Sequence, residues 1–267
     1  MDDLTLAEKI NLKKDLALNS EIVHPAQFHE RTGHCLISSK CATQTKVNEI
    51  AEFAIENKMK INKNKCAILL FNRSKKIDFR PTIQLEENVF NVSENFKLLG
   101  VVISSDLKWH EHVNFLSKKC NSRLWLLRRL TKLGAPQNIL IDLYNKQIRS
   151  ILEYAVPVWS PGLNNSDKVE LERIEKTAFS IIFCDKNYEK TLMTHKLQSL
   201  EERRWEICRK FAEKTAINPK CMSWFAESKN PYNMRNNKLY KKIFCRTNAW
   251  KNSSIPYMTE LLDNKQK

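Results

Sequence analysis

The sequence predicts an α+β fold, in which a small sheet with one helix is followed by a mostly α-helical bundle. Short apolar runs with many β-branched residues lie before Ser104, and this pattern is typical of strands. From Trp109 onward, apolar residues recur at three- and four-residue steps, which is the period of an amphipathic helix. The chain also has only four glycines in 267 residues, which favours helices.

Composition narrows the functional class. The chain has 45 basic and 30 acidic residues, and a net charge of +15 is typical of proteins that hold nucleic acid, although very soluble proteins share it. Eight cysteines lack paired spacing, and neither a signal peptide nor an 18-residue apolar run is present. These features predict an intracellular, reduced protein of the cytoplasm or nucleus, with no membrane segment.

The first part of the chain carries the strand signals. A loop is predicted over 19–41; its His24, His29, His34, Cys35 and Cys41 leave a zinc site as the alternative, but their spacing fits no common zinc pattern. The remaining predictions are a helix over 43–57 with Val47, Ile50, Ala51, Ala54 and Ile55 facing inward, a strand over 67–71, a hairpin of 82–85 with 88–92, and a buried strand over 96–103.

The second part is predicted to be four helices. The first opens at Trp109 and buries a stripe of Trp109, Val113, Leu116, Cys120, Leu124, Leu127 and Leu130. Gly134 ends it, and Pro136 starts a second helix that runs to about Tyr154. The third is expected from an N-cap at Ser166 to about Cys184, and the fourth from a capping box at Ser199 to near Ala216.

The outer face of the first of these helices is basic. It carries Lys118, Ser122, Trp125, Arg129 and Lys132. From Ser117 to Ile151 there are eight Lys or Arg residues and one acid, so internal ion pairs cannot neutralise this face and a polyanion is the expected partner. The predicted nucleic-acid-binding residues are therefore Lys118, Trp125, Arg129 and Lys132. The alternative is a solvated cationic face with Trp125 packed under a neighbouring helix.

Two further features concern the last third of the chain. Arg204 falls among apolar helix positions, so we expect it to be structural and, if buried, to have an acidic partner. The segment 229–258 carries seven basic residues, no acid, and Tyr232, Tyr240, Phe244 and Trp250. This mixture suits single-stranded nucleic acid, and a frayed tail is the alternative.

Several blocks carry a family resemblance. They are LLGVVIS, DLKWHEHV, SRLWLLRRL, IRSILEYAVPVW, LERIEKTAFSII and LEERRWEICRKFAEK, in this order. Together they resemble the C-terminal half, the palm end and thumb, of reverse transcriptases from non-LTR retrotransposons of the jockey-like group. The resemblance runs from Met1 to about Phe225. It implies an RNA-directed DNA polymerase with an RNA template and a DNA primer as partners, divided into a partial palm (1–106), a thumb-like or connection-like helical bundle (107–228) and a basic aromatic tail (229–267).

The same resemblance implies catalytic positions. Asp2 and Asp3 match the aspartate pair that helps hold two Mg²⁺ ions, and Lys65 matches a lysine of an Asn-x-x-Lys-Thr element near the incoming triphosphate, although Cys66 departs from the threonine. Two-metal phosphoryl transfer needs carboxylates around two ions about 3.5–4 Å apart. The family takes a further aspartate from an earlier palm strand that this sequence lacks, so the chain alone is expected to be inactive.

Two other interpretations stay open. One is a non-enzymatic helical module that binds nucleic acid or a protein, in which Lys65 is simply a lysine at a strand edge. The other is a likeness of the stretch from Asp78 to Trp109 to a short segment at the N terminus of AlkB-type tRNA-modifying proteins. A His-x-Asp motif with a distant histidine, which iron-dependent dioxygenase chemistry needs, is not visible in the sequence.

Overall fold

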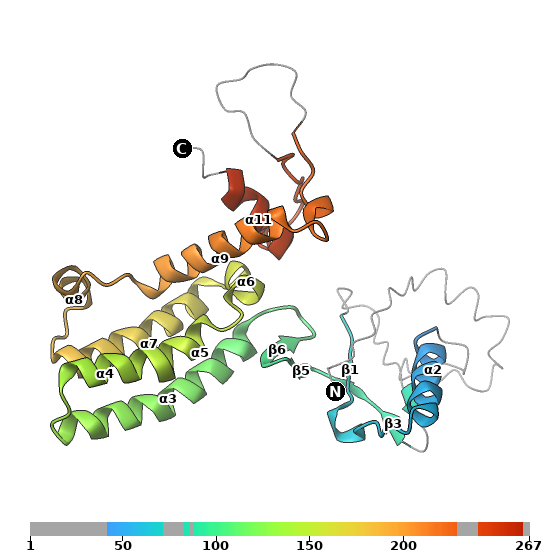
Figure 1. The fold of residues 1–267 in the computed structure, drawn as a ribbon, viewed down its shortest axis with the longest axis horizontal. Coiled ribbons are helices and arrows are strands. Elements are labelled where there is room, and N and C mark those ends of the chain that lie inside the picture. The colour runs from blue at the N-terminus through green and yellow to red at the C-terminus, as the bar shows by residue number, and fades with distance from the viewer. Residues whose placement is uncertain (1–41, 72–82, 86–87, 229–239, 264–267) are drawn as a thin grey trace, which may run out of the picture. The chain divides into compact units, whose positions relative to one another are not determined.

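The computed structural model describes residues 42–71, 83–85, 88–228 and 240–263. It is an α+β structure, as predicted, with three two-stranded sheets and a predominance of helix among the described residues. The chain divides into two compact units, 1–108 and 109–267 (Figure 1). The assignment of these parts as palm, thumb and tail stays a prediction.

Among its described residues, the first unit contains one long helix and three small strand pairs. Helix α2 spans Ala42–Glu56, and a 3₁₀ turn, η2, spans Lys63–Lys65. The strand pairs are β1 (Ile68–Leu69) with β4 (Val92–Ser93) in parallel, β2 (Ile83–Leu85) with β3 (Asn88–Phe90) in antiparallel, and β5 (Asn95–Leu98) with β6 (Val101–Ser104) in antiparallel. The predicted hairpin of β2 and β3 is thereby confirmed.

The prediction of one buried strand over 96–103 is wrong, because this stretch is a hairpin. Leu99 and Gly100 form its two-residue turn with φ angles of 46° and 85°. Positive φ at both central residues matches the right-handed twist of the flanking strands. Phe96 pairs with Ile103 across the turn, and Leu98 pairs with Val101.

Helix α2 is tied to β2 by one side chain. The Gln44 amide nitrogen donates to the Gln84 carbonyl at 2.6 Å, and the Gln84 backbone N–H donates to the Gln44 amide oxygen at 2.9 Å. Ala54 on the inner face is buried, but Ile55 is 69% exposed. The prediction that Ile55 faces inward is therefore wrong, since adjacent helix positions point about 100° apart.

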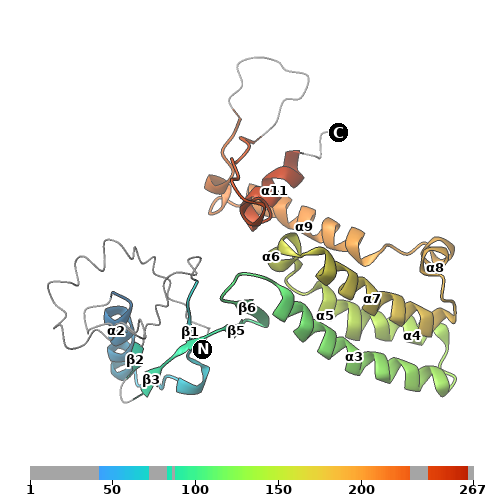
Figure 2. The same cartoon turned by 180° about the vertical axis from the view of Figure 1, so that it is seen from behind.

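The second unit is helical (Figures 1 and 2). A helical stretch after α3 changes from α4 through a π turn, labelled η3, into α5. The elements are α3 (His110–Lys132), α4 (Gln137–Tyr144), η3 (Asn145–Arg149), α5 (Ser150–Glu153), α6 (Val156–Trp159), the 3₁₀ turn η4 (Ser160–Gly162), α7 (Asn165–Phe183), α8 (Tyr188–His195), α9 (Leu200–Ile217), the 3₁₀ turn η5 (Met222–Trp224), α10 (Asn248–Lys251) and α11 (Ser254–Asp263).

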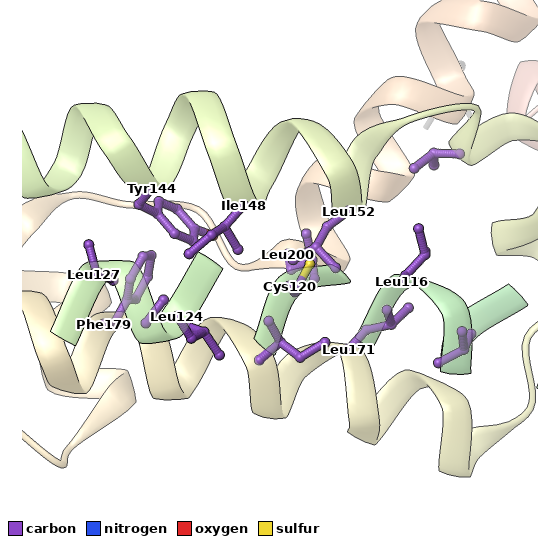
Figure 3. Packing of buried hydrophobic residues seen from close by; sticks show 14 of the residues in the cluster. Leu116, Cys120, Leu124, Leu127, Tyr144, Ile148, Leu152, Leu171, Phe179 and Leu200 are labelled. Carbon is purple, nitrogen blue, oxygen red and sulfur yellow. The ribbon is translucent and has the colours of Figure 1, made fainter. Parts of the chain in front are cut away.

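One apolar core joins α3, the α4–α5 stretch and α7 (Figure 3). Five α3 side chains of the predicted stripe are buried in it: Val113, Leu116, Cys120, Leu124 and Leu127. The facing side chains are Leu140, Tyr144, Ile148, Leu152, Leu171, Ile174, Ala178 and Phe179. The amphipathic pattern of α3 is thereby confirmed.

Three helix predictions need correction. The second predicted helix is not one regular α-helix, because the π turn interrupts it. The N-cap of α7 is Asn164, whose Oδ1 accepts the Asp167 N–H at 2.7 Å, whereas Ser166 donates its hydroxyl to the same Asn164 oxygen. Helix α8 was not predicted at all.

The capping box of α9 is confirmed, because Glu202 N–H donates to Ser199 Oγ and Ser199 N–H donates to Glu202 Oε2.

A buried carboxylate holds four helices together. Glu175 of α7 accepts hydrogen bonds from the Tyr144 hydroxyl at 2.7 Å, the Tyr188 hydroxyl at 2.5 Å and the Leu200 backbone N–H at 2.9 Å. These donors come from α4, α8 and α9. Burial, followed by the nearby Glu175 charge, raises the pKa of Tyr144 well above its ordinary value, so this hydroxyl stays a donor.

Arg204 of α9 lies beside this carboxylate cluster. It is buried, and its Nη2 lies 3.5 Å from Glu172 Oε1. Burial lowers the pKa of Arg204 and raises the pKa of Glu172, as expected when two opposite charges leave water together. The prediction of a structural, acid-paired Arg204 is confirmed.

His112 of α3 is enclosed by aromatic rings. Its ring centre lies 5.4 Å from that of Trp159, 6.3 Å from that of Trp109 and 6.4 Å from that of Phe115. The histidine is fully buried, and burial lowers its pKa from 6.5 to about 4. The imidazole is therefore neutral at physiological pH.

A second, smaller core fixes the end of the described chain. It contains Ala212, Phe225, Met258 and Leu262, and it places α11 beside α9 (Figure 1). The Phe225 and Tyr240 rings lie 5.7 Å apart between centroids. Tyr240 and α11 are therefore packed, and the alternative of a frayed tail is wrong for them. In the part of the chain that the structure describes, no helix is long and apolar enough to cross a membrane.

Candidate nucleic-acid interface

The four predicted binding residues lie on one face of α3. Lys118, Trp125, Arg129 and Lys132 are separated by seven, four and three residues, so they follow one stripe along the helix, opposite the core. All four side chains are exposed. The stripe from Lys118 to Lys132 is about 21 Å long at 1.5 Å per residue. This length matches about six base pairs of duplex at 3.4 Å each.

Trp125 is open to solvent. Its exposed fraction is 61%, so the alternative in which it packs under a neighbouring helix is wrong. The Arg129 guanidinium carbon lies 5.9 Å from the centre of the Trp125 ring, which is within the range of a cation–π contact. The helix thus presents an indole beside a guanidinium, one turn apart.

The charges on this face are not neutralised by the rest of the described chain. Lys118, Arg129 and Lys132 make no ion pair with any described acidic residue. Many basic residues elsewhere in the unit do have acidic partners, as Arg173 does with Glu170 at 2.8 Å. The α3 face therefore keeps charge that an anionic ligand can use.

The excess of positive charge is concentrated in the second unit. Residues 109–267 contain 29 basic and 16 acidic residues, whereas residues 1–108 contain 16 and 14. Almost all of the net charge thus lies on the unit that carries the α3 face. A charge distribution of this kind favours association with a polyanion over long distances.

One exposed cation near this face was missed by the sequence analysis. Arg128 lies about 60° around the helix from Trp125, at the border of the stripe, and it has no acidic partner among the described residues. A helical wheel shows from the sequence alone that Arg128 borders the face of Lys118, Trp125, Arg129 and Lys132.

The predicted catalytic positions are not brought together by the described residues. Asp2 and Asp3 lie outside them, as do the histidines and cysteines of 19–41. Lys65 is exposed at the end of η2, where its N–H donates to the Asn62 carbonyl at 3.0 Å. No group of three or more His, Cys, Asp or Glu side chains suited to a metal ion occurs within the described ranges. The roles of Asp2, Asp3 and Lys65 stay predictions.

Comparison with known proteins gives one informative similarity. No family model matches the chain, and no solved structure matches it. The RNA-directed DNA polymerase from the mobile element jockey of Drosophila funebris is 25% identical over 129 residues. The match covers 47% of this chain and 14% of that polymerase, so it concerns a small part of the larger protein. This similarity supports a reverse-transcriptase-like region in the chain.

Proposed function

We propose that this chain is part of a jockey-like non-LTR reverse transcriptase and that its helical unit binds the primer–template. The α3 stripe with its solvent-exposed Trp125 is the observation that carries the proposal. The similarity to the jockey polymerase supports the choice of nucleic acid as the polyanion. The template would be RNA and the primer DNA.

The α3 face suits the backbone of nucleic acid and carries few groups for reading bases. Lysine and arginine bind phosphates by displacing condensed counterions, and this term does not depend on sequence. Trp125 adds a flat apolar surface on which a base can stack, because every base has a π face. An enzyme that copies any template needs this kind of binding.

The catalytic step is proposed for the complete enzyme. In it, Asp2 and Asp3 would help to hold two Mg²⁺ ions, which activate the attacking hydroxyl and stabilise the leaving phosphate. Lys65 would lie near the incoming triphosphate. The contribution proposed for the helical unit is to hold the primer–template.

The salt dependence of binding tests the role of the α3 cations. Replacing Arg129 and Lys132 together by glutamine is expected to flatten the slope of log affinity against log salt by up to roughly 1.4–1.8, since each lost phosphate contact contributes about 0.7–0.9. Fluorescence anisotropy with a labelled primer–template, measured over a salt series, gives this slope. The double variant Lys186→Gln/Lys220→Gln removes the same charge at exposed positions elsewhere in the unit and should change the slope less. Equal slopes for wild type and the Arg129/Lys132 variant would contradict the proposed contact face.

Trp125 makes a separate contribution that a single substitution can isolate. Trp125→Ala should weaken single-strand binding by about 1–3 kcal/mol if a base stacks on the ring, with little change in the salt slope. Because the side chain is 61% exposed, the free energy of unfolding should fall by less than about 1 kcal/mol. Thermal unfolding and anisotropy on the same samples separate the two effects. Normal binding by a folded variant would show that no base stacks there.

A further inference from the structure

The described residues after Tyr240 form a loop that is held at both ends. At its start, the Lys241 N–H donates to the Ala226 carbonyl at 2.7 Å, and the Tyr240 ring packs near Phe225. At its end, α11 buries Met258 and Leu262 in the small core beside α9. The segment 241–251 between these anchors therefore has a fixed place on the second unit.

The side chains of this loop alternate between solvent and protein. Lys242, Phe244 and Arg246 are exposed, whereas Ile243 and Cys245 are partly buried. Phe244 is 88% exposed, more than any other large hydrophobic residue in the described chain. The outward side thus reads basic, aromatic, basic.

Trp250 adds a second aromatic to the loop. It lies on α10, whose first turn is capped by Thr247 Oγ1 accepting the Trp250 N–H at 3.2 Å, and it is 48% exposed. The loop has four exposed cations and no acid, and none of the cations pairs with an acidic residue in the described ranges: Lys241, Lys242, Arg246 and Lys251.

We propose that the loop 241–251 is a binding site for single-stranded nucleic acid, with bases stacked on Phe244 and Trp250 and phosphates held by Lys242 and Arg246. The inference rests on the proposed function and adds to it a second binding element that prefers unpaired strands. Aromatics open to solvent between uncompensated cations match the way in which single strands are bound without sequence preference.

The composition of the loop disfavours a protein partner. The cores of protein interfaces are depleted in lysine and built from contiguous apolar groups. Here the neighbours of Phe244 in the chain, Ile243 and Cys245, turn inward, and the outward neighbours are cations. A stacking surface needs an isolated ring, which this arrangement provides.

Three substitutions at one position test the proposal. Phe244→Ala and Phe244→Leu both remove the aromatic ring, so each should weaken binding of a labelled oligonucleotide of about ten unpaired nucleotides roughly 5- to 100-fold. Phe244→Tyr keeps the ring and should bind like wild type. A duplex of the same length should bind equally to all four proteins. Parallel measurements with oligo(dT) and oligo(rU) show whether DNA or RNA is preferred.

The controls separate stacking from folding and from the α3 site. Met193→Ala removes another very exposed apolar side chain of the same unit and should leave binding unchanged. Circular dichroism at the binding temperature should show equal folded fractions. Wild-type affinity for Phe244→Leu, or a loss that follows the folded fraction, would overturn the proposal. The Arg129/Lys132 variant is measured on primer–template, whereas Trp125→Ala and Phe244→Leu are each measured on unpaired strands. Because these two single variants report on their own sites separately, failure of one site is distinguishable from failure of the other.

Discussion

Replacing Glu175 by alanine is expected to lower the free energy of unfolding by about 3–5 kcal/mol. The carboxylate is 1% exposed and accepts hydrogen bonds from Tyr144, Tyr188 and the Leu200 N–H. Alanine would leave two buried donors, the Tyr144 hydroxyl and the Leu200 N–H, without this acceptor, and each such group costs about 1–3 kcal/mol. Tyr188 is half-buried and keeps a hydrogen bond to Glu172 Oε2 at 3.3 Å. Urea denaturation followed by circular dichroism measures the loss.

Glutamine at position 175 provides a matched comparison. Its amide oxygen can accept from Tyr188 and the Leu200 N–H, while its amide nitrogen can donate to the Tyr144 oxygen, so the Tyr144 O–H is the donor that loses its acceptor. We therefore expect Glu175→Gln to lose about 1–2 kcal/mol, clearly less than alanine. Glu189→Ala, at an exposed position of α8, should change stability by no more than about 0.5 kcal/mol. A loss below about 1 kcal/mol for Glu175→Ala would show that the buried carboxylate does not join the helices.

Acidification from pH 7 to pH 5 is expected to remove about 2 kcal/mol of stability through His112 alone. Burial lowers the folded-state pKa of His112 to about 4, below its ordinary value of 6.5. Between these two values, the unfolded chain binds a proton that the folded chain does not. The contribution of His112 to the free energy of unfolding is therefore fully present above pH 6.5 and is lost as the pH falls toward 4.

The variant His112→Leu tests this assignment, because it keeps an apolar group among the aromatic rings and removes the titrating one. Between pH 7 and pH 5, the unfolding free energy of the wild type should fall by about 2 kcal/mol more than that of the variant. A constant difference across this range would mean that His112 is protonated in the folded protein or does not titrate in the unfolded one.

Long, strongly periodic segments were the most predictable parts of the fold. The α3 stripe has seven apolar positions in register, and the α9 start has a capping box, so both could be located from the sequence. The hairpin at Leu99 could not be, because leucine rarely adopts positive φ and concealed the turn inside an apolar run. The N-cap of α7 was ambiguous for another reason, since Asn164, Asn165 and Ser166 are adjacent and each type can cap a helix.

The candidate site was predictable where helix geometry decides it. On the helical wheel Trp125 faces outward, whereas its residue type favours burial. Trp125 is exposed in the structure, so its place on the outer face of the helix outweighs the general preference of tryptophan for burial. The alternation of exposed and partly buried side chains in the loop 241–251 depends on how the two ends of the loop are held. Tyr240 and α11 pack against Ala212 and Phe225, which lie earlier in the sequence. No local pattern in the sequence indicates this packing.

The π turn between α4 and α5 acts as a phase correction. Leu140, Tyr144, Ile148 and Leu152 are all buried, although they are spaced by four residues. Side chains at this spacing drift about 40° per step around a regular α-helix, or about 120° over the three steps. The wider i→i+5 turn absorbs part of that drift and keeps the line pointed at α3 and α7. Inserting one residue between the π turn and Leu152, in the regular part of α5, would rotate that side chain by about 100° away from the core.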